Sequence, residues 1–181
     1  MKAGVPLSNA YRLINHGPVL LLSTRRRGRA NVCAVSWVTP VDADLVAVVL
    51  SEENDSFRSV METGEFVLNV PNRSLLRQVV GCGSVSGREC DKFRRFGLTP
   101  TRARRVRAPR VAECIGHLEC RVLPGGARLA RRHNLFIARV VAAAAERGLF
   151  TKRWMMRSPR ARSLHHLGGN VFAVPDGREL R

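Results

Sequence analysis

Short apolar runs broken by polar turns dominate the first third of the chain. Residues 18–24 form one such run, residues 25–29 supply a polar turn that contains glycine, and residues 30–38 resume the apolar pattern. This pattern predicts two strands joined as a hairpin. After a turn at 42–44, residues 45–50 are apolar on both faces and rich in valine, which is typical of a strand buried on both sides.

Further strands alternate with short helices along the rest of the chain. Residues 54–62 start with Asn and Asp and are followed by Thr63-Gly64, which are common signals for the two ends of a helix. A polar loop with four arginines, expected to be exposed, occupies residues 99–109. We predict helices over 54–62, 74–80 and 89–96, and strands over 66–70, 112–123, 134–146 and 171–174, although Ala142 to Ala145 alone favour helix.

About six strands at short spacing favour a closed antiparallel barrel over a parallel sheet. No strand is followed by Gly-x-Gly-x-x-Gly, which argues against a Rossmann domain. No Gly-x-x-x-x-Gly-Lys-Ser loop occurs, which argues against a P-loop nucleotide triphosphatase. The length of 181 residues fits one domain over 1–181, with a basic extension at about 150–181. The chain is therefore expected to be mainly β.

The net charge of +17 comes from 31 Lys and Arg against 14 Asp and Glu. A basic surface of this kind can bind nucleic acid or another anion, or can be a solvated surface without a dedicated partner. Only Lys2 and Lys92 precede Lys152, so most of the charge is arginine, as in a compositional bias. Aromatic residues make up only 6%, which counts against base stacking and a nucleic-acid partner.

The five cysteines are odd in number, irregular in spacing and preceded by no secretory leader. We expect buried thiols without disulfides, in a cytoplasmic protein. The chain has no Cys-x-x-Cys pair, and the adjacent His165 and His166 lack a third ligand, so no metal site is expected. The longest apolar runs are too short to span a membrane.

Two segments carry a resemblance to a known family. Residues 64–71 read Gly-Glu-Phe-Val-Leu-Asn-Val-Pro, and residues 86–93 read Ser-Gly-Arg-Glu-Cys-Asp-Lys-Phe. With further matches that reach Gly169, the chain resembles the flavin reductase-like, flavoredoxin-like group of FMN-binding split-barrel proteins over nearly its whole length. The resemblance implies a split β-barrel of antiparallel Greek-key type with a few short helices. It also implies a homodimer that binds FMN, or FAD, at the barrel edge near the subunit interface.

The flavin site is expected in two parts. Main-chain groups of residues 36–39 can serve the polar edge of the ring, although Ser36 and Thr39 can equally satisfy a turn before Pro40 with Trp37 in the core. Free N–H groups at the start of the 54–62 helix suit a phosphate, with Ser56 first and Lys92 as the counter-charge, unless Lys92 is a solvated helix residue. The cofactor-binding residues implied are Asn31, Ser36, Trp37, Val38, Thr39, Ser51, Asn54, Ser56, Phe57, Ser86, Gly87 and Lys92, with Asp55 turned away as a cap and Arg58 a weaker counter-charge.

His133 is the candidate catalytic residue. Many flavin reductases of the family carry Gly-Asp-His before the last long strand, whereas this chain has Arg131-Arg132-His133. The change disfavours a standard NADH-dependent mechanism and favours the flavoredoxin-like branch, although the two arginines could serve an anionic donor. No Gly-x-Ser-x-Gly or catalytic triad is present, so no general base is assigned.

The leading interpretation is an FMN-binding oxidoreductase, either an NAD(P)H-dependent flavin reductase or an electron carrier that serves a redox partner protein. The alternative is a basic nucleic-acid-binding β-barrel without redox activity, which would use the arginine runs at 25–27, 102–107 and 157–162. A third reading is a structural homologue that has lost its cofactor.

Overall fold

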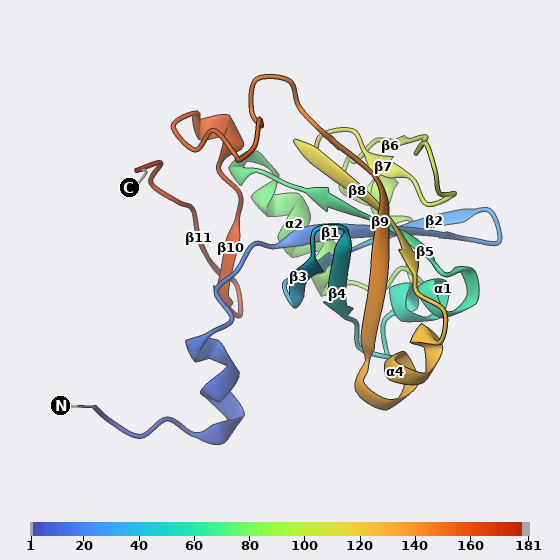
Figure 1. The fold of residues 1–181 in the computed structure, drawn as a ribbon, viewed down its shortest axis with the longest axis horizontal. Coiled ribbons are helices and arrows are strands. Elements are labelled where there is room, and N and C mark those ends of the chain that lie inside the picture. The colour runs from blue at the N-terminus through green and yellow to red at the C-terminus, as the bar shows by residue number, and fades with distance from the viewer. Residues whose placement is uncertain (1, 179–181) are drawn as a thin grey trace.

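The structure, a computed structural model, describes residues 2–178 (Figure 1). Its 3-10 helices are η1 (Leu7–Leu13), η2 (Arg73–Leu75) and η3 (Pro159–Ala161), and its α-helices are α1 (Asp55–Thr63), α2 (Leu76–Ser84), α3 (Lys92–Arg95) and α4 (Gly126–His133). Its strands are β1 (Leu20–Arg26), β2 (Arg29–Val35), β3 (Val38–Asp42), β4 (Leu45–Val49), β5 (Glu65–Val70), β6 (Pro100–Thr101), β7 (Arg110–Val111), β8 (Gly116–Val122), β9 (Leu135–Ala145), β10 (His165–Gly168) and β11 (Val171–Ala173).

Seven of these strands form one sheet in the order β2-β1-β5-β8-β9-β4-β3, and every neighbouring pair is antiparallel. The two edge strands, β2 and β3, are separated in the chain only by Ser36 and Trp37. The sheet must therefore coil until its edges meet at this crossover, although the strand order gives no ladder between them in the described chain. The predicted mainly β, antiparallel fold is confirmed, and the barrel is open along one line.

The single strand predicted over residues 30–38 is wrong, because the chain changes sheet edges within it. β2 ends at Val35, where it still pairs with Leu20 of β1, and β3 begins at Val38, which pairs with Val48 of β4. Trp37 lies between them and is 48% exposed. Since the two edges pair with different neighbours, no local pattern in the sequence marks this break.

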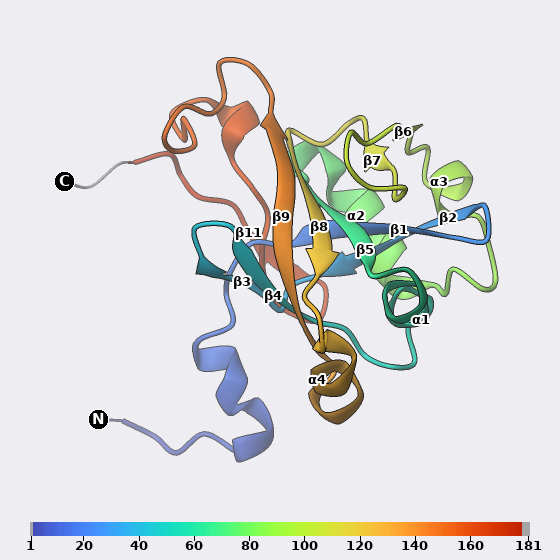
Figure 2. The same ribbon diagram turned by 45° about the vertical axis from the view of Figure 1, so that its right-hand side comes forward.

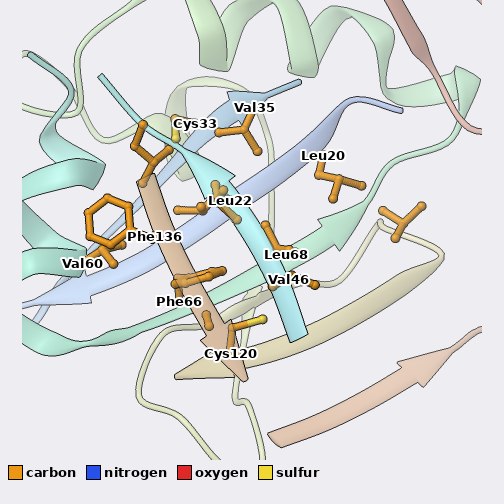
Figure 3. Packing of buried hydrophobic residues seen from close by; sticks show 14 of the residues in the cluster. Leu20, Leu22, Cys33, Val35, Val46, Val60, Phe66, Leu68, Cys120 and Phe136 are labelled. Carbon is orange, nitrogen blue, oxygen red and sulfur yellow. The ribbon is translucent and has the colours of Figure 1, made fainter. Parts of the chain in front are cut away.

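The main core lies inside the coiled sheet and is built from alternate residues of its strands. Figure 3 shows Leu22, Phe66 and Phe136, which come from three strands and meet in this core. A second cluster lies on the other face of β1 and β2, where α2 and α3 pack with Leu21, Val32 and Phe93. Leu164 and Ala161 of the C-terminal segment are also buried in these clusters.

The connection between the two long strands differs from the prediction. The strand expected from residue 112 begins at Gly116, and the strand expected from residue 134 is β9. Helix α4, which lies between these two strands, was not predicted. It is flanked by Gly125 and Asn134, which both have a positive φ. Residues 142–145 are extended, as predicted, because β9 pairs there with its neighbour in the sheet, β8.

The motif at residues 64–71 stabilises the barrel. The side chain of Asn69 is fully buried, and its amide donates to the Leu21 carbonyl at 2.8 Å and to the Ser23 hydroxyl at 3.0 Å. Its Oδ1 accepts the Val111 N–H at 2.9 Å and lies 3.0 Å from Nδ1 of His117. Asn69 therefore ties β5 to β1, β7 and β8, and burial lowers the pKa of His117 to about 4.

All five cysteines are free thiols, as predicted, and Cys90 alone of them is partly exposed. Among the described residues, no helix is long and apolar enough to cross a membrane. The N-terminal segment with η1 projects from the barrel in both overall views (Figures 1 and 2). It presents exposed apolar side chains, of which Leu7 is 92% and Ile14 is 83% exposed.

Candidate functional site

A largely apolar cavity of about 630 Å³ lies at the open line of the barrel. The residues predicted for the ring site, Ser36 to Thr39, form one wall, and Val49 and Leu135 form another. The Trp37 ring packs edge-on against Tyr11 of the N-terminal segment, with 5.4 Å between ring centroids. Trp37 is thus not a core residue, and the cavity has the size and lining of a small-molecule site.

The N-terminus of α1 carries no side-chain cap. Asn54 stands at the cap position but makes no capping hydrogen bond. Asp55 does not cap the helix either, because its carboxylate pairs with Arg26 at 3.2 Å. The free N–H groups and the local dipole at this helix end are therefore available to an anion.

A buried polar cluster lies beside this helix end. Asn31 is 5% exposed and Ser56 is 1% exposed, and Nδ2 of Asn31 donates to Oγ of Ser56 at 3.1 Å. Gly87 covers Asn31 so closely that a Cβ there would lie 2.3 Å from Oδ1 of Asn31. Three of the predicted site residues, from three separate segments, are thus in contact.

This cluster has hydrogen-bonding capacity that the described residues leave unused. Three buried side-chain oxygens have no partner among the described residues, and two of them are Oδ1 of Asn31 and Oγ1 of Thr24. Thr24 and Asn31 are directly opposite each other in the β1–β2 ladder. Because a buried polar atom without a partner costs free energy, two at one place suit a ligand that can form hydrogen bonds with them.

Lys92 is a buried cation and not a solvated helix residue. It is 4% exposed, and its ammonium donates to the Cys82 carbonyl at 2.7 Å. No carboxylate among the described residues pairs with it, although a buried charge normally has such a partner. Burial raises the pKa of the nearby Cys33 thiol, while a hydrogen bond with Ser56 and the charge of Lys92 lower it. Lys92 and Ser56 therefore act on the same buried thiol, that of Cys33.

Three arginines that the sequence analysis did not assign to the flavin site lie beside the first turn of α1. Arg26, Arg29 and Arg88 line a pocket of about 230 Å³ together with Asp55 and Ser59. Guanidinium nitrogens of Arg29 and Arg88 donate to main-chain carbonyls of Gly87 and Glu53 at 2.5 and 2.9 Å. The signal available in the sequence was Arg88 inside the Ser-Gly-Arg segment next to Gly87.

His133 is exposed at the end of α4. Its neighbour Asn134 accepts the N–H of Leu50 at 2.9 Å, which brings this helix end next to the turn that leads into α1. Leu135, two residues after His133, lines the apolar cavity. Arg131 and Arg132 are exposed on the same helix.

Other predicted residues are engaged elsewhere. The ring of Phe57 packs in the core against Phe136, with centroids 5.3 Å apart, so its side chain does not face the site. Ser51 is exposed, and its hydroxyl accepts the Glu53 N–H at 3.4 Å. The Ser86 hydroxyl accepts the Arg88 N–H at 3.2 Å, which shapes the loop over Asn31. No group of three or more metal-ligating side chains occurs among the described residues.

Comparison with known proteins identifies the family. The model of the flavin reductase like domain matches residues 12–164. The chain belongs to the flavin reductase-like family. Its relatives in this family include the uncharacterized protein YddH of Escherichia coli, which is 32% identical over 180 residues and is matched across 96% of this chain and 95% of its own length.

Two solved structures show the same architecture. An FMN-binding domain of a flavin reductases-like enzyme from Shewanella baltica superimposes with a TM-score of 0.85 and 31% identity, covering 99% of this chain and 96% of its own. Flavoredoxin from Desulfovibrio vulgaris superimposes with a TM-score of 0.84 at 22% identity, covering 100% and 97%. The split barrel is therefore the fold of this chain, and its recognition from residues 64–71 and 86–93 is confirmed.

Proposed function

We propose that this protein is an FMN-binding oxidoreductase. The observation that carries the proposal is the buried pair of Asn31 and Ser56 beside a helix end without a side-chain cap, where Oδ1 of Asn31 and Oγ1 of Thr24 have no partner among the described residues. Lys92 adds a buried positive charge that acts on the nearby Cys33. A phosphate ester with adjacent hydroxyl groups, as on the ribityl phosphate of FMN, has the acceptors and donors that this cluster lacks. The Shewanella protein, similar over nearly its full length, is an FMN-binding domain.

The residues present fit this cofactor in two places. Lys92, Ser56 and the free N–H groups of the first turn of α1 would hold the phosphate, with Arg29 and Arg88 adding positive charge at the rim. Gly87 lies so close to Asn31 that a side chain at this position would clash with Oδ1 of Asn31. Main-chain groups of residues 36–39 would orient the ring in the apolar cavity, where Trp37 and Leu135 exclude water.

Bound flavin supplies hydride or electron transfer, so the chain needs no catalytic base of its own. His133 is exposed, lies two residues before Leu135 of the apolar cavity, and is the side chain we propose to meet the electron donor or acceptor. We propose NAD(P)H as the source of electrons, delivered either to free flavin or through bound FMN to a redox partner protein. We further propose a homodimer, and a cytoplasmic location in keeping with the free thiols.

Spectroscopy of the purified protein tests this function. We expect a yellow protein that releases FMN on denaturation, or a colourless one that binds added FMN and quenches its fluorescence. Anaerobic addition of NADH or NADPH should then bleach the flavin band. A protein that neither contains FMN nor binds it when added would refute the proposal.

Matched variants test the site. Lys92→Met should weaken FMN binding at least tenfold, because a charge-assisted hydrogen bond contributes about 1.5–3 kcal/mol. Lys152→Met removes the same charge at an exposed position away from the cluster and should leave affinity within twofold. Equal losses in the two variants would mean that net charge, and not this cluster, attracts the phosphate.

A further inference from the structure

A second basic cavity lies on the opposite face of the sheet. Side chains alternate between the two faces of a strand, so Arg25 of β1 points away from the face that carries Thr24 and the cluster at α1. The cavity has a volume of about 640 Å³ and lies under the loop between β6 and β7. Both overall views show β6 and β7 on the far side of β8 from β3 and β4 (Figures 1 and 2).

Arginines from three separate segments converge on this cavity. Its lining includes six arginines and one acidic residue, Glu65, and no aromatic side chain. Glu65 is shared by Arg107 and Arg121, at 3.3 and 3.5 Å. The six arginines are Arg25, Arg102, Arg104, Arg105, Arg107 and Arg121.

The positive charge is only partly neutralised. The side chains of Arg102, Arg104 and Arg105 have no hydrogen-bond or ion-pair partner among the described residues. Arg25 donates only to main-chain carbonyls, those of Arg107 at 3.2 Å and Gly28 at 2.9 Å. The cavity therefore holds more guanidinium groups than its one carboxylate can balance, which favours a multiply charged anion.

The four arginines of this loop are exposed, as predicted, but other residues of the loop are held against the sheet. The fully buried carboxylate of Glu119 accepts the N–H of Arg104 at 2.9 Å and of Arg105 at 2.6 Å. The side chains of Ala103, Val106 and Ala108 are buried in a small cluster with Val67. Because the backbone is already ordered, a ligand loses little free energy in organising the site.

We propose that this cavity binds a compact polyphosphate group, meaning two or more linked phosphates. Its volume is in the range of small-molecule sites, and its arginines come from three separate segments, which favours an anion with several charged groups over a single phosphate. With no aromatic side chain in the lining, a nucleotide base has no surface on which to stack, so affinity should follow the number of phosphates. The site is independent of flavin binding.

Nucleic acid is the macromolecular alternative, and the arrangement of the arginine runs disfavours it. The run at 157–162 does not line the cavity; within it, Arg160 pairs with Glu146 and Arg162 donates to the Met156 carbonyl at 3.1 Å. The three arginine runs of the sequence therefore do not join into one track along which a strand could lie.

Calorimetry with inorganic tripolyphosphate, pyrophosphate and phosphate, at one fixed ionic strength, tests the proposal. Affinity should rise with each added phosphate, and ATP and GTP should bind as well as tripolyphosphate. Arg104→Ala should weaken tripolyphosphate binding about tenfold, whereas Arg147→Ala, which removes the same charge from an exposed position outside the cavity, should change it less than twofold.

Thermal unfolding of both variants checks that the fold is retained, since both side chains are exposed. Equal weakening in the two variants would overturn the proposal in favour of non-specific attraction by the net charge. The proposal would also be overturned if tripolyphosphate did not bind. Binding of single-stranded DNA that depends on Arg104, without binding of tripolyphosphate, would instead favour a nucleic-acid site. A protein that does not bind FMN could still bind tripolyphosphate in this cavity. The flavin proposal and the polyphosphate proposal can therefore be refuted independently.

Discussion

Glu119 is the carboxylate on which the arginine-bearing loop depends, and its neutralisation should destabilise the whole barrel. Its Oε1 accepts the N–H of Arg104 and Nε of Arg110, both at 2.9 Å, and its Oε2 accepts the N–H of Arg105 at 2.6 Å. Burial raises the pKa of Glu119, whereas these hydrogen-bond donors and the charge of Arg110 lower it. The lowering effects together are larger, so the pKa of Glu119 lies below its ordinary value.

Glu119→Gln places an amide NH₂ among N–H donors and leaves Arg110, which is 15% exposed, without a counter-charge. Breaking one side of a buried ion pair costs about 3–5 kcal/mol, a large part of a typical unfolding free energy of about 5–15 kcal/mol. We expect a melting temperature about 10 °C lower. Glu113→Gln is the control: its exposed carboxylate accepts the Thr99 N–H, and its loss should cost less than about 1 kcal/mol.

Urea unfolding at pH 7 and at pH 4 separates the contribution of the charge from that of shape. A carboxyl with a lowered pKa in the folded state stabilises the protein above its unfolded pKa, near 4.3, and this stabilisation is lost as the pH falls through the lower folded value. The stability gap between wild type and Glu119→Gln should therefore narrow below pH 4.5. A gap under 1 kcal/mol at pH 7, or one that stays constant with pH, would refute this account of the loop.

Three further predictions follow from buried groups. In Lys92→Met, the unfolding free energy of the flavin-free protein, measured by urea denaturation, should be unchanged or higher, because the ammonium is buried without a carboxylate. FMN affinity should still fall, and a loss of stability above about 1 kcal/mol would contradict this prediction. A thiol reagent should label Cys90 alone in the folded protein, since burial raises the pKa of Cys82 and Cys120 to about 12; fast labelling of a second thiol would show otherwise. Because the pKa of His117 in the folded protein is about 4, this residue should lower the unfolding free energy by at most about 3 kcal/mol as the pH falls from 6.5 to 4. In His117→Gln, the unfolding free energy measured by urea titration should depend less steeply on pH over that range.

Much of the fold follows from local patterns. The first hairpin, helix α1 with Gly64 at its end, and the strand of residues 65–70 have the periodicity and end signals that the structure shows. Residues 142–145 could be assigned to a strand because they continue an apolar stretch, although alanine favours helix. These elements were predictable because their own residues determine them.

What escaped prediction depends on contacts between distant segments. The break at Ser36 and Trp37 exists because two sheet edges meet there. The order of the arginine loop comes from Glu119 and Glu65, which lie on other strands. Likewise, the motif residue Asn69 has a structural role that only the neighbouring strands reveal.

The burial of Lys92 was also beyond the reach of the sequence. A lysine in a short helix is usually solvated, and only the packing of loop 86–90 and α2 around it places its ammonium on the Cys82 carbonyl. The site residues could be named from the family motif, but the unpartnered oxygens of Thr24 and Asn31 could not, because they arise from the pairing of β1 with β2.

The crossover at Ser36 and Trp37 determines how the barrel can change its width. Because the strand order gives the described chain no ladder between β2 and β3, these two edges can move apart there without the loss of a ladder hydrogen bond. Everywhere else around the sheet, widening would break hydrogen bonds between paired strands. The open line is therefore the part of the described sheet that can widen at the lowest cost in hydrogen bonds.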